Sequence, residues 1–213
     1  MKITILGATG NAGSRIVTEA LSRGHEITAV VRNPAATSNL PSGIKVLIGD
    51  ANNIKDVIAF STGQDIVISA IRPSSGYENE VIQTTQTLMD GLSKSDVRLL
   101  VVGGASTLIV PDTDGKTVIE DSNYLPVSAR HIGKASADQL TVCLEETRVD
   151  WAYLSPAAQF FPGERTGKYR LGTDDLLIDA EGISKISMED AAIVLLDEAE
   201  QPKHHRTRFT VAY

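Results

Sequence analysis

The sequence has one cysteine, Cys143, among its 213 residues. A single cysteine cannot form an internal disulfide, and this scarcity fits a reducing cytoplasm, where we expect the protein to reside. Cys143 stands within a helical pattern, which favours a place in the core over a nucleophilic role. The chain enters a strand pattern at once, so we expect no signal peptide. No stretch approaches the roughly 20 apolar residues of a membrane span.

Histidine and positive charge are also scarce. The four histidines do not stand with cysteines or carboxylates at a metal-ligand spacing, so we expect no metal site. With 20 Lys and Arg against 27 Asp and Glu, the net charge of −7 argues against a general nucleic-acid or anionic-membrane surface. A phosphate site stays compatible, because a helix N-terminus and one arginine act locally. The length predicts a single domain, residues 1–213.

Three glycines near the start of the sequence, by contrast, stand at a spacing that is typical of a ligand-binding turn. A short apolar run at residues 3–6 is followed by Gly7, Gly10 and Gly13, and then by helical spacing from Ala12. In a strand–turn–helix, the first glycine permits a tight turn, the second lets a pyrophosphate approach the backbone, and the third lets helix and strand pack closely. The N–H groups at the helix start then face the anion. This turn therefore predicts a dinucleotide site formed by Gly7, Thr9, Gly10, Asn11, Ala12 and Gly13.

The rest of the chain alternates strand and helix patterns. This alternation predicts an α/β fold of the Rossmann type, a doubly wound parallel sheet whose ligands lie beyond the carboxyl ends of the strands. We expect a polar loop at 107–126, a lid at 159–182 with Phe160 and Phe161 as an aromatic wall or partly core, and a substrate-side region at about 155–213. Ser187 and Asp190 form a capping pair for the last helix. The expected strands are 26–31, 44–48, 65–70, 97–102, 150–154, 183–186 and 208–213, and the expected longer helices are 77–92 and about 129–146.

Two stretches carry a resemblance to a known family. The run Gly-Ala-Thr-Gly-Asn-Ala-Gly at 7–13 resembles the atypical short-chain dehydrogenase/reductases, NAD(P)H-binding proteins that include the NmrA-like regulators and biliverdin-IXβ/flavin reductase. Residues 150–157 and 162–170 are similar to bacterial proteins called NADH-flavin reductases. The likeness spans nearly the whole chain and implies a nicotinamide cofactor.

The resemblance and the strand ends together suggest further cofactor contacts. In the family the Gly-Asp pair after the third strand lies against adenine, which implies Asp50 and Ala51; a turn with a helix cap near Asn53 is the alternative, and both can hold. At the tip of the fourth strand, the small residue Ala70 suits close passage of the cofactor's ribose and phosphate, and Ile71 is a further predicted contact. Arg72 is either a phosphate contact or solvated. The family's backbone meets the nicotinamide carboxamide at the positions of Ser155, Pro156 and Ala157.

The end of the second strand bears on the choice of cofactor. An NAD-specific fold usually places an acidic residue there, which binds the ribose 2′-hydroxyl. This chain has Arg32 at that position, and an arginine can form a charge-assisted fork with a 2′-phosphate. A solvated arginine at a strand end is the alternative. We favour NADP(H) over NAD(H).

The most informative absence is the Tyr-x-x-x-Lys pair with which short-chain reductases protonate alcohols and ketones. Ser106 matches the serine position and Lys134 is the candidate lysine, but Arg130 stands four residues before it. Arginine stays protonated and cannot relay a proton as a phenol does. Tyr124 lies before Pro126 and cannot occupy the helical position. His131 is one position off register and is either a proton donor or a histidine at a helix start.

Three functions stay open. The first is an NAD(P)H-dependent reductase that passes hydride to a flavin, a quinone or a similar conjugated ring, which needs no placed tyrosine. The second is a non-catalytic NmrA-like sensor of NADP(H) that signals to a partner. A sugar-nucleotide epimerase or dehydratase is the third, although such enzymes carry the tyrosine and a larger substrate domain. The sequence leaves open whether the protein is a monomer or a homodimer.

Overall fold

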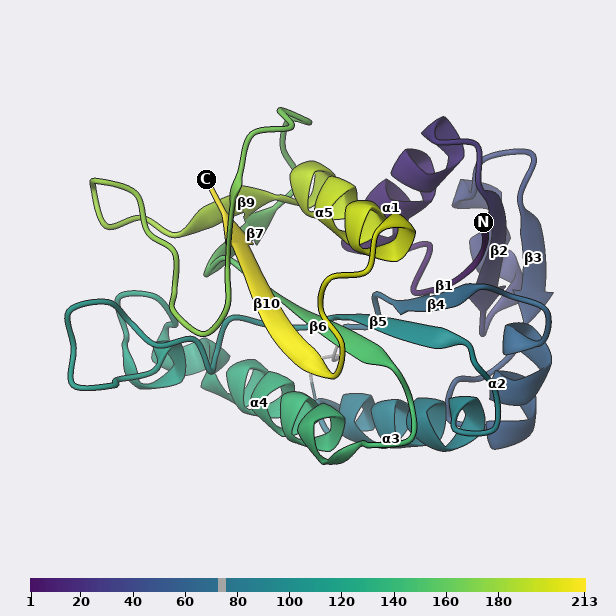
Figure 1. Ribbon diagram of the computed structural model, residues 1–213, viewed down its shortest axis with the longest axis horizontal. Helices are drawn as coiled ribbons and strands as arrows, with labels where there is room; N and C mark the ends of the chain where they lie inside the picture. Colours follow the sequence, from purple (N-terminus) through teal and green to yellow (C-terminus); the bar gives the residue numbers. More distant parts are fainter. Residues whose placement is uncertain (73–75) are drawn as a thin grey trace.

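One parallel-rich sheet runs through the centre of the computed structural model, which describes residues 1–72 and 76–213. Helices α1 and α5 cover one face of this sheet, and α2, α3 and α4 cover the other (Figure 1). The helices are α1 (Asn11–Ser22), α2 (Ile54–Ser61), α3 (Glu80–Leu92), α4 (Arg130–Glu145) and α5 (Met188–Glu200), with 3-10 turns η1 (Pro34–Asn39), η2 (Val118–Glu120) and η3 (Val127–Ala129). The strands are β1 (Lys2–Leu6), β2 (Glu26–Val31), β3 (Lys45–Ile48), β4 (Ile66–Ser69), β5 (Arg98–Val102), β6 (Trp151–Pro156), β7 (Gln159–Phe161), β8 (Arg170–Gly172), β9 (Lys185–Ser187) and β10 (Thr207–Ala212).

Two apolar cores form, one on each face of the sheet. Strand residues alternate between them, so that Ile5 joins the core under α1 and α5 while Leu6 joins the other. Cys143 lies in the second core, where burial, with a smaller contribution from the Glu146 charge, raises the pKa of its thiol to about 12. The prediction of Cys143 as a core residue is confirmed.

The strand order is β3-β2-β1-β4-β5-β6-β10-β8, and the neighbours are parallel except for the antiparallel pair β10 and β8. The predicted doubly wound fold is confirmed. In β1, Ile5 pairs with Ala29 of β2 on one side and with Ile68 of β4 on the other. The chain therefore winds outward from β1 to β3 and then returns to β4, which places the switch point of the topology between β1 and β4.

Most predicted elements are present with shifted ends. The helix expected at 77–92 begins at Glu80, and the short strand expected at 183–186 is β9. The predicted cap of the last helix is confirmed, because the Ser187 hydroxyl accepts a hydrogen bond from the Asp190 N–H at 3.0 Å.

The prediction of a lid at 159–182 is wrong for much of that segment. Strand β7 pairs with β9, and β8 extends the main sheet beside β10. Between them, the fully buried Asp190 carboxylate accepts hydrogen bonds from the Thr166 and Gly167 N–H groups, each at 2.8 Å. Arg165 also donates to Glu19 of α1 at 2.8 Å. This segment is therefore fixed against α1 and α5.

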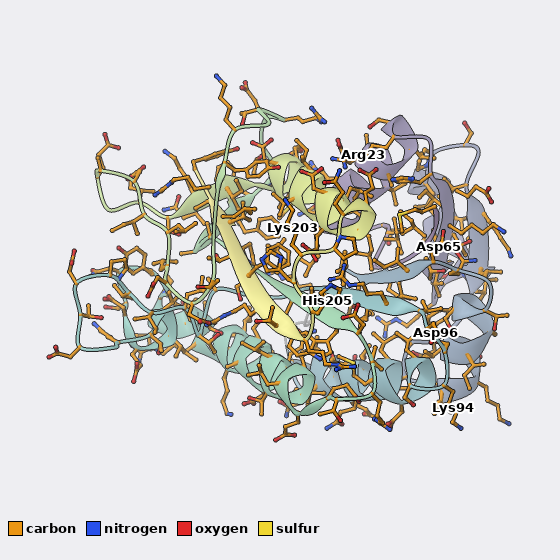
Figure 2. The ribbon with its side chains drawn as sticks, in the orientation of Figure 1. Arg23, Asp65, Lys94, Asp96, Lys203 and His205 are labelled. Atoms are coloured by element: carbon orange, nitrogen blue, oxygen red, sulfur yellow. The ribbon has the colours of Figure 1, made fainter. Side chains whose placement is uncertain are left out.

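Charged side chains gather where the strands begin. Asp65, Asp96 and His205 lie in the loops that lead into β4, β5 and β10 (Figure 2). Several of these groups are paired, since Asp65 accepts from the Lys2 N–H at 2.7 Å and His205 lies 3.0 Å from Asp150. Of the helices in the described ranges, none combines the length and apolarity needed to cross a membrane.

Candidate functional site

The turn between β1 and α1 is packed too tightly for any residue but glycine at two positions. Gly7 has a φ of +75°, and a Cβ on it would lie 2.6 Å from the Ala70 carbonyl oxygen. A Cβ on Gly13 would lie 2.0 Å from the Gly7 carbonyl oxygen. The turn therefore presses the start of α1 onto the tips of β1 and β4, as the glycine spacing predicts.

The N-terminus of α1 is left open. Its first flanking residue, Gly10, gives no side-chain cap, and the first turn holds no acidic residue. In α2 and α5, by comparison, the side chains of Asn53 and Ser187 accept hydrogen bonds from backbone N–H groups. Within 4 Å, a Cβ on Gly10 would meet the Gly7 carbonyl oxygen, at 3.2 Å. Uncapped N–H groups at the positive end of a helix dipole form a cradle for an anion.

A smaller cavity of about 360 Å³ lies on one side of this cradle. Its predicted cofactor residues are Gly7, Thr9, Gly10, Arg32, Asp50, Ala51, Ala70, Ile71 and Arg72. The Arg32 side chain is 70% exposed, and its nearest carboxylate oxygen, on Glu80, is 4.0 Å away. Asp50 also makes a local turn, because its carboxylate accepts from the Asn52 N–H at 2.9 Å. Asp50 therefore makes a turn and also lines the smaller cavity, where its contact with a cofactor stays a prediction.

A larger cavity of about 610 Å³ lies on the other side of the cradle, beyond the carboxyl ends of β4, β5 and β6. The two cavities adjoin at the turn, because five residues line both of them: Thr9, Gly10, Ala70, Ile71 and Arg72. Of the predicted site residues, the larger cavity adds Asn11, Ala12, Ser106, Pro156 and Ala157.

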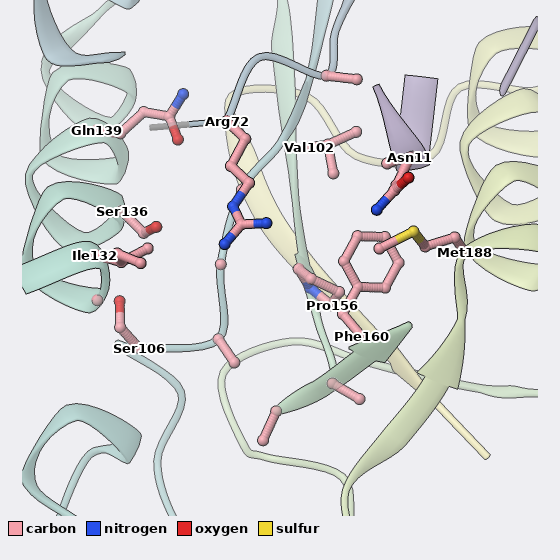
Figure 3. Close-up of a pocket in the computed structure, with 18 of the residues that line it drawn as sticks. Asn11, Arg72, Val102, Ser106, Ile132, Ser136, Gln139, Pro156, Phe160 and Met188 are labelled. Atoms are coloured by element: carbon pink, nitrogen blue, oxygen red, sulfur yellow. The ribbon is translucent and has the colours of Figure 1, made fainter. Parts of the chain in front are cut away.

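The larger cavity has apolar walls. Phe160 and Met188 lie on the side of Asn11, and Ile132 of α4 lies on the opposite side (Figure 3). Phe160 also packs partly against the α1–α5 core, so both of its predicted roles hold. Apolar and aromatic walls of this kind suit an apolar ligand.

Ser106 is a lining residue of the larger cavity whose hydroxyl is buried. It is 4% exposed, lines the cavity, and its hydroxyl has no hydrogen-bond partner within the described residues. A buried hydroxyl without a partner is costly unless a ligand or water completes it. This observation supports the predicted contact of Ser106 with a bound molecule.

Tyr153 is fully buried outside the lining of the larger cavity, and its hydroxyl is held by hydrogen bonds within the protein. Its hydroxyl donates to the Ser136 carbonyl at 3.0 Å and accepts from the Gly104 N–H at 3.3 Å. Burial raises the pKa of this phenol above its ordinary value. A Cβ on Gly103 would lie 1.8 Å from the ring, so glycine is required there.

Lys134, predicted as catalytic, does not line either cavity. Its side chain is 71% exposed, and its Nζ lies 2.8 Å from the Asp138 carboxylate on the same helix. Successive residues of an α-helix point about 100° apart, so when Gly133 and Ser136 face the cavity, Lys134 faces solvent. His131 is also outside the lining and lies 3.3 Å from Glu78. Neither residue is placed to act on a ligand in this structure.

Ser155 differs from its two neighbours. It is fully buried in β6, while Pro156 and Ala157 reach the larger cavity. Ser155 therefore does not line the cavity, unlike the two residues that follow it.

Several lining residues were not predicted from the sequence. Tyr124 reaches the cavity from the loop before α4, with its hydroxyl donating to the Gly182 carbonyl at 3.1 Å. The helical line through Ile132 and Ser136 could have indicated the α4 wall, whereas nothing in the sequence marks Tyr124 or Met188. The unpredicted lining residues include Val118, Tyr124, Leu125, Ile132, Gly133, Ser136, Gln139, Ala158 and Met188. Across residues 1–72 and 76–213, no group of three or more His, Cys, Asp or Glu residues could hold a metal ion.

Comparison with known proteins agrees with this geometry. A family model described as NAD(P)H-binding matches residues 7–202. The chain is 37% identical over 215 residues to the uncharacterized protein YwnB of Bacillus subtilis, which covers 99% of this chain and 98% of YwnB. A structure from Bacteroides thetaiotaomicron, provisionally named an epimerase, is 40% identical, with a TM-score of 0.88 and coverage of 100% of this chain and 96% of that one.

A structure from Streptococcus pneumoniae, provisionally named an NADH-flavin reductase, is 32% identical, with a TM-score of 0.89 and coverage of 100% and 99%. The family match covers the glycine turn, both cavities and α5. The chain therefore belongs to the NAD(P)H-binding family of atypical short-chain dehydrogenase/reductases.

Proposed function

We propose that this protein is an NAD(P)H-dependent oxidoreductase that passes hydride to a flavin, a quinone or a similar conjugated acceptor. The observation that carries the proposal is that the two cavities adjoin at the glycine turn and share five lining residues. The smaller cavity has the features of a nucleotide site, and the larger cavity has apolar walls. The residues that line both are Thr9, Gly10, Ala70, Ile71 and Arg72. A dinucleotide laid across the turn would bring its reactive ring into the larger cavity.

The residues present fit such a cofactor. The open N-terminus of α1 would take the pyrophosphate, Asp50 and Ala51 the adenosine, and Pro156 and Ala157 the nicotinamide end. The bound cofactor would supply a hydride at the nicotinamide ring. Ser106, buried and without a partner among the described residues, would hydrogen-bond the ring's substituent or the acceptor.

The missing Tyr-x-x-x-Lys pair favours a conjugated acceptor. Neither Tyr153 nor Lys134 lines the larger cavity, and the Tyr153 hydroxyl donates to the Ser136 carbonyl, so neither is placed to give a proton to a carbonyl oxygen there. A flavin or quinone spreads the charge that hydride brings over its own atoms, and water can then supply the proton. The role left to the chain is to hold two rings against one another between Phe160 and Ile132 and to exclude bulk water.

Arg32 supports NADP(H) as the preferred cofactor. Arg32 lines the smaller cavity, and its guanidinium is exposed. Among the described residues, its ion-pair partner is the Glu80 carboxylate, at 4.0 Å. A guanidinium free to turn can form a fork with a 2′-phosphate.

Anaerobic stopped-flow absorbance tests the proposal. Protein and NADPH are mixed with FMN or menadione, and oxidation of NADPH is followed with NADH as the comparison. The proposal expects oxidation that depends on protein and saturates with acceptor. Tight cofactor binding without oxidation across flavins and quinones would instead support an NmrA-like NADP(H) sensor, the function that the missing tyrosine also permits.

A sugar-nucleotide epimerase is less well supported. The relative from Bacteroides carries that name provisionally, but here the Tyr124 hydroxyl donates to the Gly182 carbonyl and is not paired with a lysine in the described residues. As further parts of the proposal, the 213 residues form one domain, act in the cytoplasm on a small-molecule acceptor, and need no nucleic acid or membrane partner.

A further inference from the structure

Arg72 is an exposed residue just beyond the end of β4 that lines both cavities, and Figure 3 draws its side chain toward the middle of the larger one. In Figure 3 its guanidinium lies between the side that carries Ser106 and Ser136 and the side that carries Phe160 and Pro156. In this view Val102 is drawn between Arg72 and Asn11, where α1 begins. The positive end of α1 and the Arg72 guanidinium are therefore two separate places in which a negative charge is favoured.

The charge on Arg72 is not neutralised by an ion pair in the described residues. The acidic residues that follow it along the chain have other partners, since Glu78 lies 3.3 Å from His131 and Glu80 lies 4.0 Å from Arg32. The remaining lining of the larger cavity holds no Asp or Glu. A cation beside apolar walls and an unpartnered serine hydroxyl is an arrangement that selects an anion on a flat ring.

We propose that Arg72 contacts the acceptor and stabilises the negative charge that it gains on reduction; this inference rests on the proposed function. Hydride transfer from NADPH adds two electrons and one hydrogen to a neutral quinone or flavin ring, leaving NADP⁺ and a ring anion. One proton from water then completes the neutral reduced product. Arg72 donates N–H hydrogen bonds to the ring oxygen that carries the charge and replaces, as an electrostatic group, the tyrosine that this chain lacks.

Calorimetry with a stable anionic ring tests the contact without turnover. The NADP⁺-saturated protein is titrated with 2-hydroxy-1,4-naphthoquinone, an anion at neutral pH, and with 1,4-naphthoquinone, a neutral ring of the same outline. Losing a charge-assisted hydrogen bond should weaken binding of the anion to Arg72→Gln by about tenfold, with little change for the neutral ring. Arg72→Lys should recover part of the loss. Lys94→Gln, which removes an equal charge at an exposed position outside both cavities, should leave both affinities unchanged.

The NADPH affinity of Arg72→Gln distinguishes two roles for Arg72, contact with the acceptor and contact with the cofactor pyrophosphate. The proposal expects the Arg72→Gln protein to keep its NADPH affinity within about twofold, as surface changes usually do, and to lose turnover with saturating acceptor. A loss of NADPH affinity as large as the loss for the anionic ring would show that Arg72 holds the pyrophosphate and would overturn the proposal. So would equal binding of the anion by wild type and Arg72→Gln, or no binding by either. Arg72-dependent binding without NADPH oxidation would leave this inference standing and remove the reductase.

Discussion

Gly13 lies so close to Gly7 that a Cβ on Gly13 would sit 2.0 Å from the Gly7 carbonyl oxygen. No real Cβ makes such an approach to backbone, so the first turn of α1 can lie against the end of β1 only while residue 13 is glycine. This contact fixes where the N–H groups of α1 point, and the cofactor cradle depends on it.

Gly13→Ala should therefore lower the free energy of unfolding by about 1–3 kcal/mol, since overpacking forces the backbone apart. Urea unfolding measures the change. Gly10→Ala is the matched control, because its Cβ would meet the same oxygen at 3.2 Å and a small shift relieves the contact. Equal stability losses in the two variants would contradict this account of the turn.

Arg32→Glu should weaken the binding of NADPH more than the binding of NADH. A 2′-phosphate loses a charge-assisted partner and gains a repulsive one, which should reduce NADPH affinity by about tenfold or more. Fluorescence titration with both cofactors gives the ratio. A loss of the same size for NADPH and NADH would show that Arg32 does not read the 2′-phosphate.

Ser106→Ala should lower kcat/KM more than Lys134→Ala does. Ser106 is buried and faces the larger cavity, so loss of its hydrogen bond to a ligand should lower kcat/KM by about fivefold or more. Lys134 is exposed and paired with Asp138, so its removal should change kcat/KM by less than about twofold. Steady-state NADPH oxidation compares them, and the reverse order would restore Lys134 as the catalytic residue.

Glu19 should make the fold sensitive to acid. Hydrogen bonds from Arg165, and then from Arg23, lower the pKa of its carboxyl against the opposing effect of burial. A carboxyl whose folded pKa lies below its unfolded value stabilises the fold above the unfolded pKa, near 4.3. That stabilisation is lost as the pH falls through the folded pKa.

Glu19→Gln should thus destabilise the protein at pH 7 by about 1–3 kcal/mol, the usual range for a hydrogen bond to a charged group. Its deficit relative to wild type should shrink below about pH 4. Urea unfolding across this pH range measures both curves. A deficit that stays constant down to pH 3 would mean that the Glu19 charge is not the cause.

The sequence predicts many of the residues that line the smaller cavity, because they lie in local motifs. The turn from Gly7 to Gly13 is one continuous stretch, and Arg32 and Ala70 each follow directly from a recognisable strand. Strand tips of a parallel sheet meet at one edge, so the cavity follows from the order of the elements.

The far wall of the larger cavity depends on packing between distant segments. Tyr124 and Met188 reach it from a loop and from the start of α5, and no local pattern marks them. Lys134 was placed by motif spacing, although Arg130 had already broken the motif, and the register of α4 turns it outward. The expected lid is fixed by Glu19 and Asp190, which lie far away in the sequence.

Isothermal titration of the folded protein with NADPH tests the central claim most directly. The account predicts saturable binding of one cofactor per chain by wild type, and no detectable heat from a folded Gly10→Val protein, whose side chain would cover the N–H groups of α1. Absence of heat with both NADPH and NADH in wild type, or equal affinity in Gly10→Val, would contradict the assignment of a nucleotide to this turn.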